Sequence, residues 1–575
     1  MKCKVTTFVR KYEKIHFIYF KNFRHIVSVN IIRGGTKMRF IKRTNANSIS
    51  ELVEKNTGMK ADEFLNVNEK PYIYGLAEAV KFFKKNASKQ VFVIGDYDSD
   101  GINATAIMYL GLKKFGIEAK MRLPKRFSEG YGLSEKIVKE TEEFLKIIDE
   151  IENGLIITVD NGIAAHAAIK RAKDKGISVI ITDHHMGGLV LPEADVIVDP
   201  NAEDGHVPKR FQSEFKNYCG AALAYRFIEE LLPEGTDLTD LLILASIATV
   251  TDIMDLVGAN RFLVKKGLEL VNKGYGPKGL RLIIDKLKLS EHICEEDFGF
   301  SIGPVFNASS RLYDEGASLV LNVLTKDDVR EEDVDILIKN NEERKQITKK
   351  SLAICEMFVK ERPIVVYEPS LGEGIIGLVA GKFCEKYACP TIVFTDTEED
   401  GMIKGSARSP EGIHLKQILD KVAELGLIEK YGGHAGAAGL TIKKSKLEEF
   451  KNAFRKEVGK LPELTDDVFY DIEVPFGMVS AYMEDLERFA PYGKGNPRPV
   501  FRIKVDVPDG GYRVIGKNKD SFLINARVLK LLGFGMVPLY DYLGKPTFLD
   551  CIGSLSLSWF RGRSTNQLNI KAMMS

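Results

Sequence analysis

Short apolar runs alternate with helix-forming stretches in the first half of the chain, and this alternation constrains the fold more than any other feature. The runs are Val91–Ile94, Leu155–Val159, Ser178–Thr182 and Asp195–Val198. Amphipathic stretches such as Ala104–Phe115 and Ala164–Lys175 lie between them. Short, mainly apolar runs of this length are typical of strands buried on both faces. The pattern therefore predicts an α/β fold, with a parallel sheet and helices on both of its faces.

The first three apolar runs each end in acidic or histidine residues. These residues are Asp96, Asp98 and Asp100 after the first run, Asp160 after the second, and Asp183, His184 and His185 after the third. Ligands of open parallel sheets bind at the carboxyl ends of the strands, so we expect these side chains to meet at one edge. So many carboxylates repel one another unless cations lie between them. Asp and His without thiolates suit Mn²⁺, or Mg²⁺ with waters, and two such ions can promote phosphodiester hydrolysis.

Each of these motifs has a plainer interpretation when it stands alone. The acidic loop at 96–101 resembles a calcium-binding loop, Asp160-Asn161-Gly162 is typical of a turn, and Asp183–His185 could be a surface cluster. A calcium-binding helical hand needs glutamate at its twelfth position, where this chain has Ile107. Their occurrence together at successive strand ends argues against coincidence.

Length and charge limit what kind of protein this can be. A chain of 575 residues is long enough for three or four domains. Its 82 Lys and Arg nearly balance its 80 Asp and Glu, so a polyanionic partner would be held by a local groove rather than by overall charge. No apolar run approaches the ~18 residues of a membrane span. Seven cysteines without a C-x-x-C pair are typical of a reduced, cytoplasmic protein that does not associate with membranes.

Changes in composition divide the rest of the chain. The stretch from Asp327 to Lys360 is highly charged with one apolar stripe, which predicts a long helix joining two domains. Apolar runs that begin at Pro363 and Pro390 start a second α/β unit, and short alternating runs after Asp467 predict a small β-barrel or sandwich. The predicted divisions are an N-terminal segment (38–90), the parallel-sheet domain (91–326), the connecting helix (327–360), the second α/β domain (361–462) and the C-terminal β domain (463–575).

Residues 1–37 differ from the rest of the chain. They contain nine Lys and Arg and a single acid, Glu13. A transit peptide would be richer in serine. Arg33 to Met38 can be encoded by a string that contains a bacterial ribosome-binding sequence before a start codon. We therefore expect residues 1–37 to be a non-native leader and Met38 to be the true start.

The motifs together resemble those of the DHH phosphoesterase superfamily. Gly95–Gly101, Val159–Gly162 and Thr182–His185 are similar to its first three motifs, and Ala248–Asp252 is similar to its fourth. The resemblance implies a set of metal ligands, namely Asp98, Asp100, Asp160, His184 and Asp252. It also places His185 beside the scissile phosphate, with Asp96 and Asp183 as supporting carboxylates, and it implies two divalent ions.

Further segments resemble the RecJ type of this superfamily and its associated DHHA1 domain. They are Pro124–Leu133, Gly303–Leu312, Gly405–Ser409, Gly432–Gly439 and Pro491–Phe501, the last leading into an oligonucleotide-binding (OB) barrel. The family usually has glycine where Ser310 precedes Arg311, which leaves the geometry of that expected loop open. The resemblance implies substrate-binding roles for Arg126, Asn307, Arg311, Ser406, Arg408, Gly433 and His434. Their side chains or backbone amides can bind phosphate oxygens.

The resemblance implies a 5′→3′ exonuclease that releases 5′-mononucleotides from single-stranded DNA in recombination and repair. It also implies a monomer whose partners include a single-stranded-DNA-binding protein and a helicase. The alternatives are a phosphodiesterase of nanoRNA or cyclic dinucleotides, against which the C-terminal barrel argues, and an inactive scaffold, against which the intact metal ligands argue.

Two other features of the sequence permit two interpretations each. Gly372–Gly377 spells G-x-G-x-x-G but does not follow its strand at once, which favours a glycine-rich helix start over a dinucleotide site. Trp559 lies beside basic residues and is either a platform for base stacking or a core aromatic.

Overall fold

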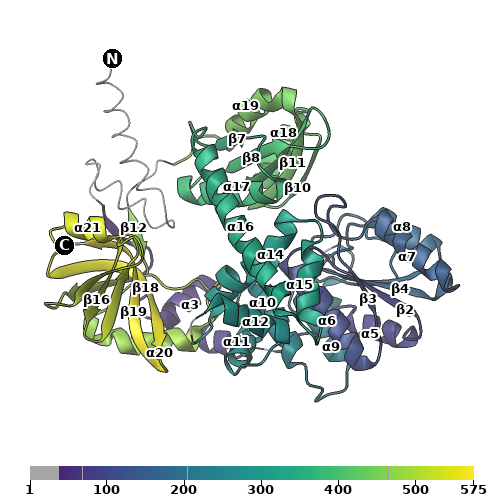
Figure 1. Ribbon diagram of the computed structural model, residues 1–575, viewed down its shortest axis with the longest axis horizontal. Helices are drawn as coiled ribbons and strands as arrows, with labels where there is room; N and C mark the ends of the chain where they lie inside the picture. Colours follow the sequence, from purple (N-terminus) through teal and green to yellow (C-terminus); the bar gives the residue numbers. More distant parts are fainter. Residues whose placement is uncertain (1–37, 68, 204, 290, 463–464, 466) are drawn as a thin grey trace.

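Three lobes make up the protein in a computed structural model, which describes residues 38–575 except 68, 204, 290, 463–464 and 466 (Figure 1). The predicted leader, residues 1–37, lies outside the described residues. No helix within the described ranges is long and apolar enough to cross a membrane.

The first lobe contains the predicted parallel sheet. Its strands, in order across the sheet, are β3 (Lys120–Arg122), β2 (Gln90–Ile94), β4 (Gly154–Val159), β5 (Ser178–Thr182) and β6 (Val196–Val198). From β2 the chain passes to β3 on one side and then returns to β4 on the other, so the topology switches between β2 and β4. The four predicted strands are confirmed. The sequence pattern missed β3, because a three-residue strand with two basic residues has no apolar period.

Helices cover both faces of this sheet, as predicted. Alternate residues of β2 point to opposite faces, so that Val93 and Ile94 belong to different hydrophobic cores. One face packs against α5 (Leu76–Lys85), α6 (Ser99–Phe115) and α9 (Gly220–Leu231). The other packs against α7 (Glu135–Ile147) and α8 (His166–Asp174).

A helical region follows the sheet in the sequence. Its helices are α10 (Thr239–Thr251), α11 (Gly258–Asn272), α12 (Lys278–Leu287), α13 (Glu295–Asp297), the π-helical turn η4 (Phe298–Ile302), α14 (Gly303–Leu312) and α15 (Gly316–Thr325). The predicted connecting helix is α16 (Glu331–Glu356). Val334 and Leu337 near its start join the core of the first lobe, whereas Cys355 near its end joins the core of the second lobe. The helix therefore links the two lobes by packing into both.

The second lobe is a smaller α/β domain. Its sheet has the order β10 (Lys430–Gly433), β11 (Ala437–Lys443), β9 (Met402–Arg408), β8 (Thr391–Asp396) and β7 (Ile364–Tyr367), and only β7 and β8 pair in parallel. Three helices pack on it, namely α17 (Glu373–Tyr387), α18 (Leu415–Glu424) and α19 (Leu447–Val458).

The third lobe is the predicted C-terminal β domain. Its seven-stranded sheet has the order β13 (Ile472–Glu473), β14 (Phe501–Asp506), β18 (Phe548–Phe560), β19 (Arg563–Met574), β17 (Leu529–Gly533), β16 (Ser521–Ala526) and β15 (Tyr512–Ile515). Helices α20 (Val479–Phe489) and α21 (Val537–Tyr542) pack on this sheet.

The start of the described chain is part of this third lobe. Strand β1 (Phe40–Lys42) pairs in parallel with β12 (Val468–Tyr470). Buried residues of α3 (Ile49–Thr57) and α4 (Ala61–Leu65) then enter the same core as α20. Two segments more than 400 residues apart in the sequence thus fold as one unit.

Candidate active site

Helix α6 begins on the acidic loop that follows β2. Asp98 caps the helix, because its Oδ1 accepts hydrogen bonds from the amides of Asp100 (2.9 Å) and Gly101 (3.1 Å). The Ser99 amide donates to Oδ1 of Asn307 at 2.9 Å, and this bond attaches α14 to the same loop. The acidic loop is therefore fixed by hydrogen bonds to the first turn of α6 and by one hydrogen bond to α14.

A second helix N-terminus holds Asp100. Its two carboxylate oxygens accept hydrogen bonds from the amides of Gly220 (2.7 Å) and Ala221 (2.9 Å) at the start of α9. The partial positive charge of a helix N-terminus stabilises a carboxylate at this position. Gly220 also permits close packing, because a Cβ there would overlap the side chain of Asp160.

His184 is the centre of the acidic cluster. Its Nε2 lies 3.1 Å from Oδ1 of Asp160, 3.6 Å from Oδ2 of Asp100 and 3.7 Å from Oδ2 of Asp252. Asp252 comes directly after the last residue of α10, so the end of that helix places it here. Residues from three separate sequence motifs and one helix end thus meet at the switch point of the sheet.

The possible ligand atoms form two sets that share His184. One set is Asp160, His184 and His185, and the other is Asp100, His184 and Asp252, with all atoms of a set within 4.8 Å of one another. The structure thus brings Asp100, Asp160, His184 and Asp252 together as expected. Asp98 belongs to neither set, and one of its oxygens is used to cap α6.

The electrostatics of the cluster suit divalent cations. Burial, followed by repulsion from Asp100, raises the pKa of both Asp160 and Asp252 well above the usual range. Burial and Asp98 do the same for Asp96, whose Oδ2 is buried without a hydrogen-bond partner among the described residues. Carboxylate oxygens and an imidazole nitrogen are donors that Mn²⁺ and Mg²⁺ accept. A bound cation would remove the repulsion that destabilises the ionised carboxylates.

His185 forms an ion pair beside this cluster. Its Nδ1 donates to Oδ1 of Asp183 at 2.7 Å, and Asp183 also accepts from the amides of His184 (2.8 Å) and Ile163 (2.9 Å). Burial alone would lower the pKa of His185, but the Asp183 hydrogen bond together with the charges of Asp183, Asp252 and Asp100 outweighs burial and raises that pKa to about 9. Asp183 therefore orients an imidazole ring that carries a positive charge.

Two tyrosines brace these residues, and sequence reasoning assigned a role to neither. The Tyr131 hydroxyl donates to the carbonyl of Asp160 at 2.9 Å and lies 3.1 Å from Nδ1 of His185. Its ring meets the Tyr97 ring edge-on, and the Arg126 guanidinium lies 4.6 Å from the Tyr97 ring centre. Both tyrosines lie inside segments that the sequence singled out, so an aromatic side chain within a polar motif was the available signal.

Arginines gather at the junction of the first two lobes. Arg311, at the end of α14, donates to the carbonyl of Gly374 at 3.2 Å. Its pKa falls to about 9 because of burial first and then because of Arg126, Arg344 and Arg408. Burial also lowers the pKa of Arg344, a residue of α16 that the sequence analysis did not select. Positive charges held this close favour an anion.

The glycines of the G-x-G-x-x-G segment make room for these arginines. A Cβ on Gly374 would overlap the Arg311 carbonyl. A Cβ on Gly377 would lie 3.0 Å from Oγ of Ser406 and 3.1 Å from Nη2 of Arg408. The segment starts α17 and is explained by packing, as in the preferred interpretation of the sequence.

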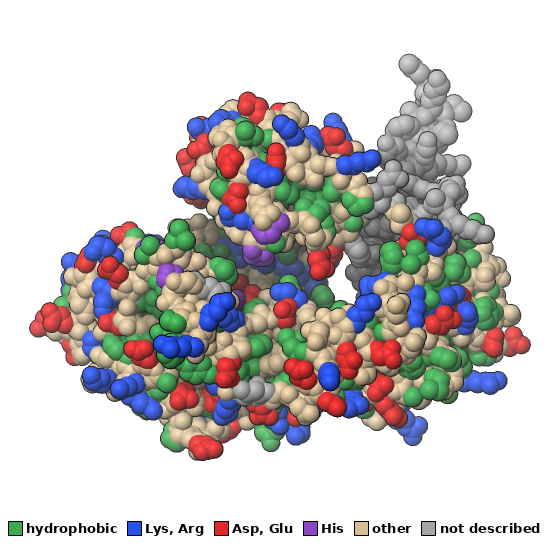
Figure 2. Space-filling model, turned by 180° about the vertical axis from the view of Figure 1, so that it is seen from behind, with side chains coloured by type: hydrophobic (Ala, Val, Ile, Leu, Met, Phe, Trp, Pro, Cys, Tyr) green, Lys and Arg blue, Asp and Glu red, His purple; other side chains and the backbone are tan. Residues whose placement is uncertain are grey.

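The edge of the second lobe completes the basic pocket. Arg408 donates to Oγ of Ser406 at 3.1 Å, and burial lowers the pKa of Arg408. Gly433 has φ of 144°, which only glycine adopts readily, and it precedes the exposed His434. Burial and then Arg408 lower the pKa of His434. Figure 2 shows a hollow between the second lobe and the first, with histidine side chains at its rim.

One expectation needs correction. The segment that contains Asn307, Ser310 and Arg311 is not a loop but helix α14. Ser310 is 1% exposed within this helix, and its hydroxyl donates to the Asn307 carbonyl at 3.3 Å. A regular helical position does not require glycine, so the serine leaves the backbone undisturbed.

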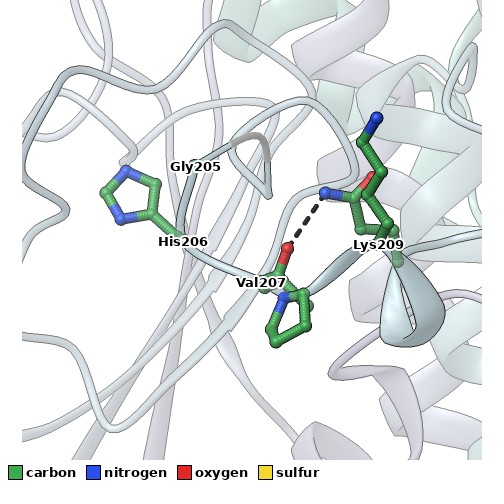
Figure 3. A pocket seen from close by; sticks show the side chains of 6 residues that line it. Gly205, His206, Val207 and Lys209 are labelled. Carbon is green, nitrogen blue, oxygen red and sulfur yellow. Dashed lines mark hydrogen bonds between the residues drawn. The ribbon is translucent and has the colours of Figure 1, made fainter.

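A separate hollow of about 650 Å³ lies on the segment after β6 (Figure 3). Its lining consists of Gly205, His206, Val207, Pro208, Lys209 and Gln212. Gln212 closes one side by donating to the Val207 carbonyl at 3.0 Å. None of the predicted site residues lines this hollow.

Known protein families match all three lobes. The model of the DHH family N-terminal domain matches residues 90–249, that of the DHHA1 domain matches 360–460, and that of the RecJ OB domain matches 470–572. The single-stranded-DNA-specific exonuclease RecJ of Dickeya dadantii is 31% identical over 499 residues, which cover 81% of this chain and 83% of the relative. The chain belongs to the RecJ family. The resemblance seen in the sequence motifs is thereby confirmed.

Other RecJ proteins show how far the likeness extends. RecJ of Escherichia coli strain K12 is 30% identical over 79% of this chain and 80% of the relative. The crystal structure of RecJ from Thermus thermophilus with Mn²⁺ matches with a TM-score of 0.75 at 24% identity, covering 94% of this chain and 79% of that one. A structure of exonuclease RecJ bound to manganese matches with a TM-score of 0.56 at 29% identity, over 68% of this chain and 96% of that one. The RecJ fold thus extends over nearly the whole chain.

Proposed function

We propose that this RecJ-family chain is a single-stranded-DNA-specific exonuclease that hydrolyses phosphodiester bonds from the 5′ end and releases 5′-mononucleotides. One observation carries the proposal. His184 lies within 3.7 Å of carboxylates from three elements, near a group of arginines that form no ion pair with a carboxylate among the described residues. Ligands for cations beside groups that bind anions are what a phosphodiesterase requires.

Two divalent ions are the proposed cofactors, Mn²⁺ by preference and Mg²⁺ as an alternative. Asp98, Asp100, Asp160, His184 and Asp252 would hold them, and Asp160 is the ligand proposed to serve both ions. When bound, such ions lower the pKa of water and stabilise the charge of a leaving oxygen. The charged ring of His185, held by Asp183, can donate a hydrogen bond to an oxygen of the scissile phosphate. Asp96 supports the ligand loop from a buried position.

The proposed direction of digestion follows from the basic pocket. Arg126, Arg311, Ser406, Arg408, Gly433 and His434 would bind the terminal 5′ phosphate, while Asn307 positions the ligand loop through Ser99. A phosphate in the pocket gains charge-assisted hydrogen bonds that a hydroxyl group cannot make. Such contacts set the register of the strand, so each cut would release one nucleotide.

The domain boundaries are proposed as the sequence predicted them: residues 91–326, 361–462 and 463–575, with 38–90 before them and 327–360 between the first two. The OB-type third domain favours this function over hydrolysis of nanoRNA or cyclic dinucleotides, because short substrates need no extended grip. We expect a monomer that acts in the cytoplasm in DNA recombination and repair. A single-stranded-DNA-binding protein and a helicase are its proposed partners.

End-labelled oligonucleotides test the proposal. We expect single-stranded DNA labelled at either end to lose mononucleotides from the 5′ end, with RNA and blunt duplex as poor substrates. Arg408→Ala should reduce the preference for a 5′ phosphate over a 5′ hydroxyl more than it slows cleavage of the hydroxyl form. Mononucleotides released from the 3′ end, or cuts in circular single strands, would contradict the proposed polarity.

A further inference from the structure

One solvent-accessible stripe runs along the helical segment from η4 through α14. In the pattern of burial, Phe300, Pro304, Asn307 and Arg311 are accessible, while most residues between them are buried. Spacings of three and four residues place side chains on one face of a helix. The stripe thus starts at Arg311 in the basic pocket, passes Asn307 beside the metal-ligand loop and ends at Phe300. Eleven residues of helix extend about 16 Å.

Phe300 is unusual at the far end of this stripe. Its side chain is 81% exposed, more than any other aromatic in the described part of the chain. The residues around it are fixed, because Phe298 and Ile302 are fully buried and Gly299 packs against Val250 of α10. The turn is π-helical, a conformation that is frequent at functional sites. A rigid support with a freely accessible ring is suited to stacking.

The third lobe meets the first beside this turn. Glu295, three residues before Phe298, accepts hydrogen bonds from the Tyr492 amide (3.1 Å) and from Arg498 (2.6 Å). The loop between Tyr492 and Arg498 then reaches the turn that follows Asp252. There the Leu256 amide donates to the carbonyl of Lys494 at 2.7 Å.

This contact brings a cation of the third lobe to the turn that follows Asp252. The Lys494 side chain is 57% exposed, and its Nζ lies 3.4 Å from Oδ1 of Asp255, which is a loose ion pair. Asp255 comes three residues after the proposed metal ligand Asp252. Lys494 therefore lies where the third lobe meets the first, close to the end of α10 that carries Asp252.

We infer that Phe300 and Lys494 form a track for the bound strand on the 3′ side of the scissile phosphate, with a nucleobase stacked on Phe300 and a backbone phosphate on Lys494. The inference rests on the proposed function and adds the route between the metal site and the third lobe. An aromatic ring combined with a basic side chain is the usual means of holding single strands without sequence preference. The DNA strand would enter over η4, and its 5′ end would lie in the basic pocket.

Cleavage kinetics on long and short substrates test this track. We expect Phe300→Ala to raise KM for a 20-nucleotide strand roughly fivefold or more, because stacking of one base contributes about that factor to affinity. Its kcat, and its cleavage of a 5′-phosphorylated dinucleotide, should not change, and Phe300→Tyr should restore the wild-type KM. Lys494→Gln should raise KM and reduce the slope of log affinity against log salt by about one.

Matched controls come from an exposed turn elsewhere in the first lobe. Tyr275 is 53% exposed after α11, so Tyr275→Ala removes an accessible ring and Lys273→Gln a nearby charge. Neither change should alter KM. An unchanged KM for the long strand in Phe300→Ala, or an equal loss on the dinucleotide, would overturn the inference.

A binding experiment separates this inference from the proposed function. Strands that carry 2-aminopurine at single positions are bound to the full chain with Asp160→Asn, which prevents their digestion. We expect fluorescence quenching at one internal position, lost on adding Phe300→Ala. Absence of that position-specific quenching would overturn the track. Failure of the wild-type chain to cleave any DNA would instead refute the function.

Discussion

At the scale of single residues, Asp160 combines an unusual backbone with a buried charge. Its φ of 61° lies in the left-handed region, its amide donates to the Thr182 carbonyl at 3.0 Å, and its side chain is nearly inaccessible. Asparagine adopts this conformation more readily than most residues. Asp160→Asn therefore removes the charge with little strain, which alanine would not do.

We expect Asp160→Asn to lower kcat roughly 10³-fold or more, because a ligand of the reacting site is lost. Binding of single-stranded DNA should persist through the phosphate contacts. Without metal, the melting temperature should stay the same or rise, because one of several repelling carboxylates is gone. Cleavage within a few-fold of wild type would show that the site is assigned wrongly.

Asp199, at the end of β6, allows a prediction about pH. It is 3% exposed, and burial, followed by Asp183, raises its pKa to about 8. The folded state thus holds a proton that the unfolded state releases near pH 4, so the contribution of Asp199 to stability falls as pH rises from about 4 to about 8. The side chain in Asp199→Asn does not titrate, so the variant lacks this dependence of stability on pH. In EDTA, its melting temperature should exceed that of wild type by a margin that grows up to pH 8 and is then constant. A margin that does not depend on pH would contradict the assignment.

At the scale of elements, α17 shows how a helix positions binding groups that it does not itself contain. Gly377 faces Ser406 and Arg408 of β9, whereas Gly381, one turn later, has open space around it. Replacing helical glycine by alanine stabilises a helix by about 1 kcal/mol. The two positions therefore form a matched pair, in which both changes favour the helix and only one disturbs the pocket.

Gly377→Ala should weaken the preference for 5′-phosphorylated strands several-fold, because its methyl group would displace the Arg408 guanidinium by a few tenths of an ångström. Gly381→Ala should leave that preference unchanged and raise the melting temperature. The comparison uses cleavage rates of paired 5′-phosphate and 5′-hydroxyl strands. Equal preferences in both variants would show that Arg408 does not contact the terminal phosphate.

At the scale of the whole molecule, the two ends of the described chain depend on each other. Ile49, Leu52 and Phe64 are almost fully buried in the core of the third lobe. A chain that ends near Pro462 retains every proposed metal ligand, but it exposes these residues. Removing the third lobe cleanly therefore requires removing the N-terminal segment as well.

We expect a chain of residues 70–462 to remain folded and to cleave very short oligonucleotides, with weaker binding to long strands and a shallower salt dependence. A chain of residues 38–462 should aggregate, because its N-terminal helices lose their core. Size-exclusion chromatography and cleavage of 5-nucleotide and 30-nucleotide strands distinguish the two. Equal affinity of residues 70–462 and the full chain for the long strand would refute a role of the third lobe in binding.

The sequence by itself determined the parallel sheet and the edge at which its functional residues meet. Strands such as Ser178–Thr182 can be recognised in the sequence because strands buried on both faces of a sheet consist mainly of apolar residues, here Val179, Ile180 and Ile181. Asp160 and His184 could be placed together because parallel strands end at one edge of their sheet. The family resemblance added Asp252, which lies at the end of a helix rather than a strand.

Only the tertiary structure decided which side chains support this site and what joins the lobes. Tyr131 contacts Asp160 and His185, and Arg344 lies near Arg311, and no local period marks such contacts between distant parts of the sequence. The union of β1 with β12, like the approach of Lys494 to Asp255, depends on how separate lobes pack against each other. Periodicity reports which face of an element is buried, but not which partner buries it.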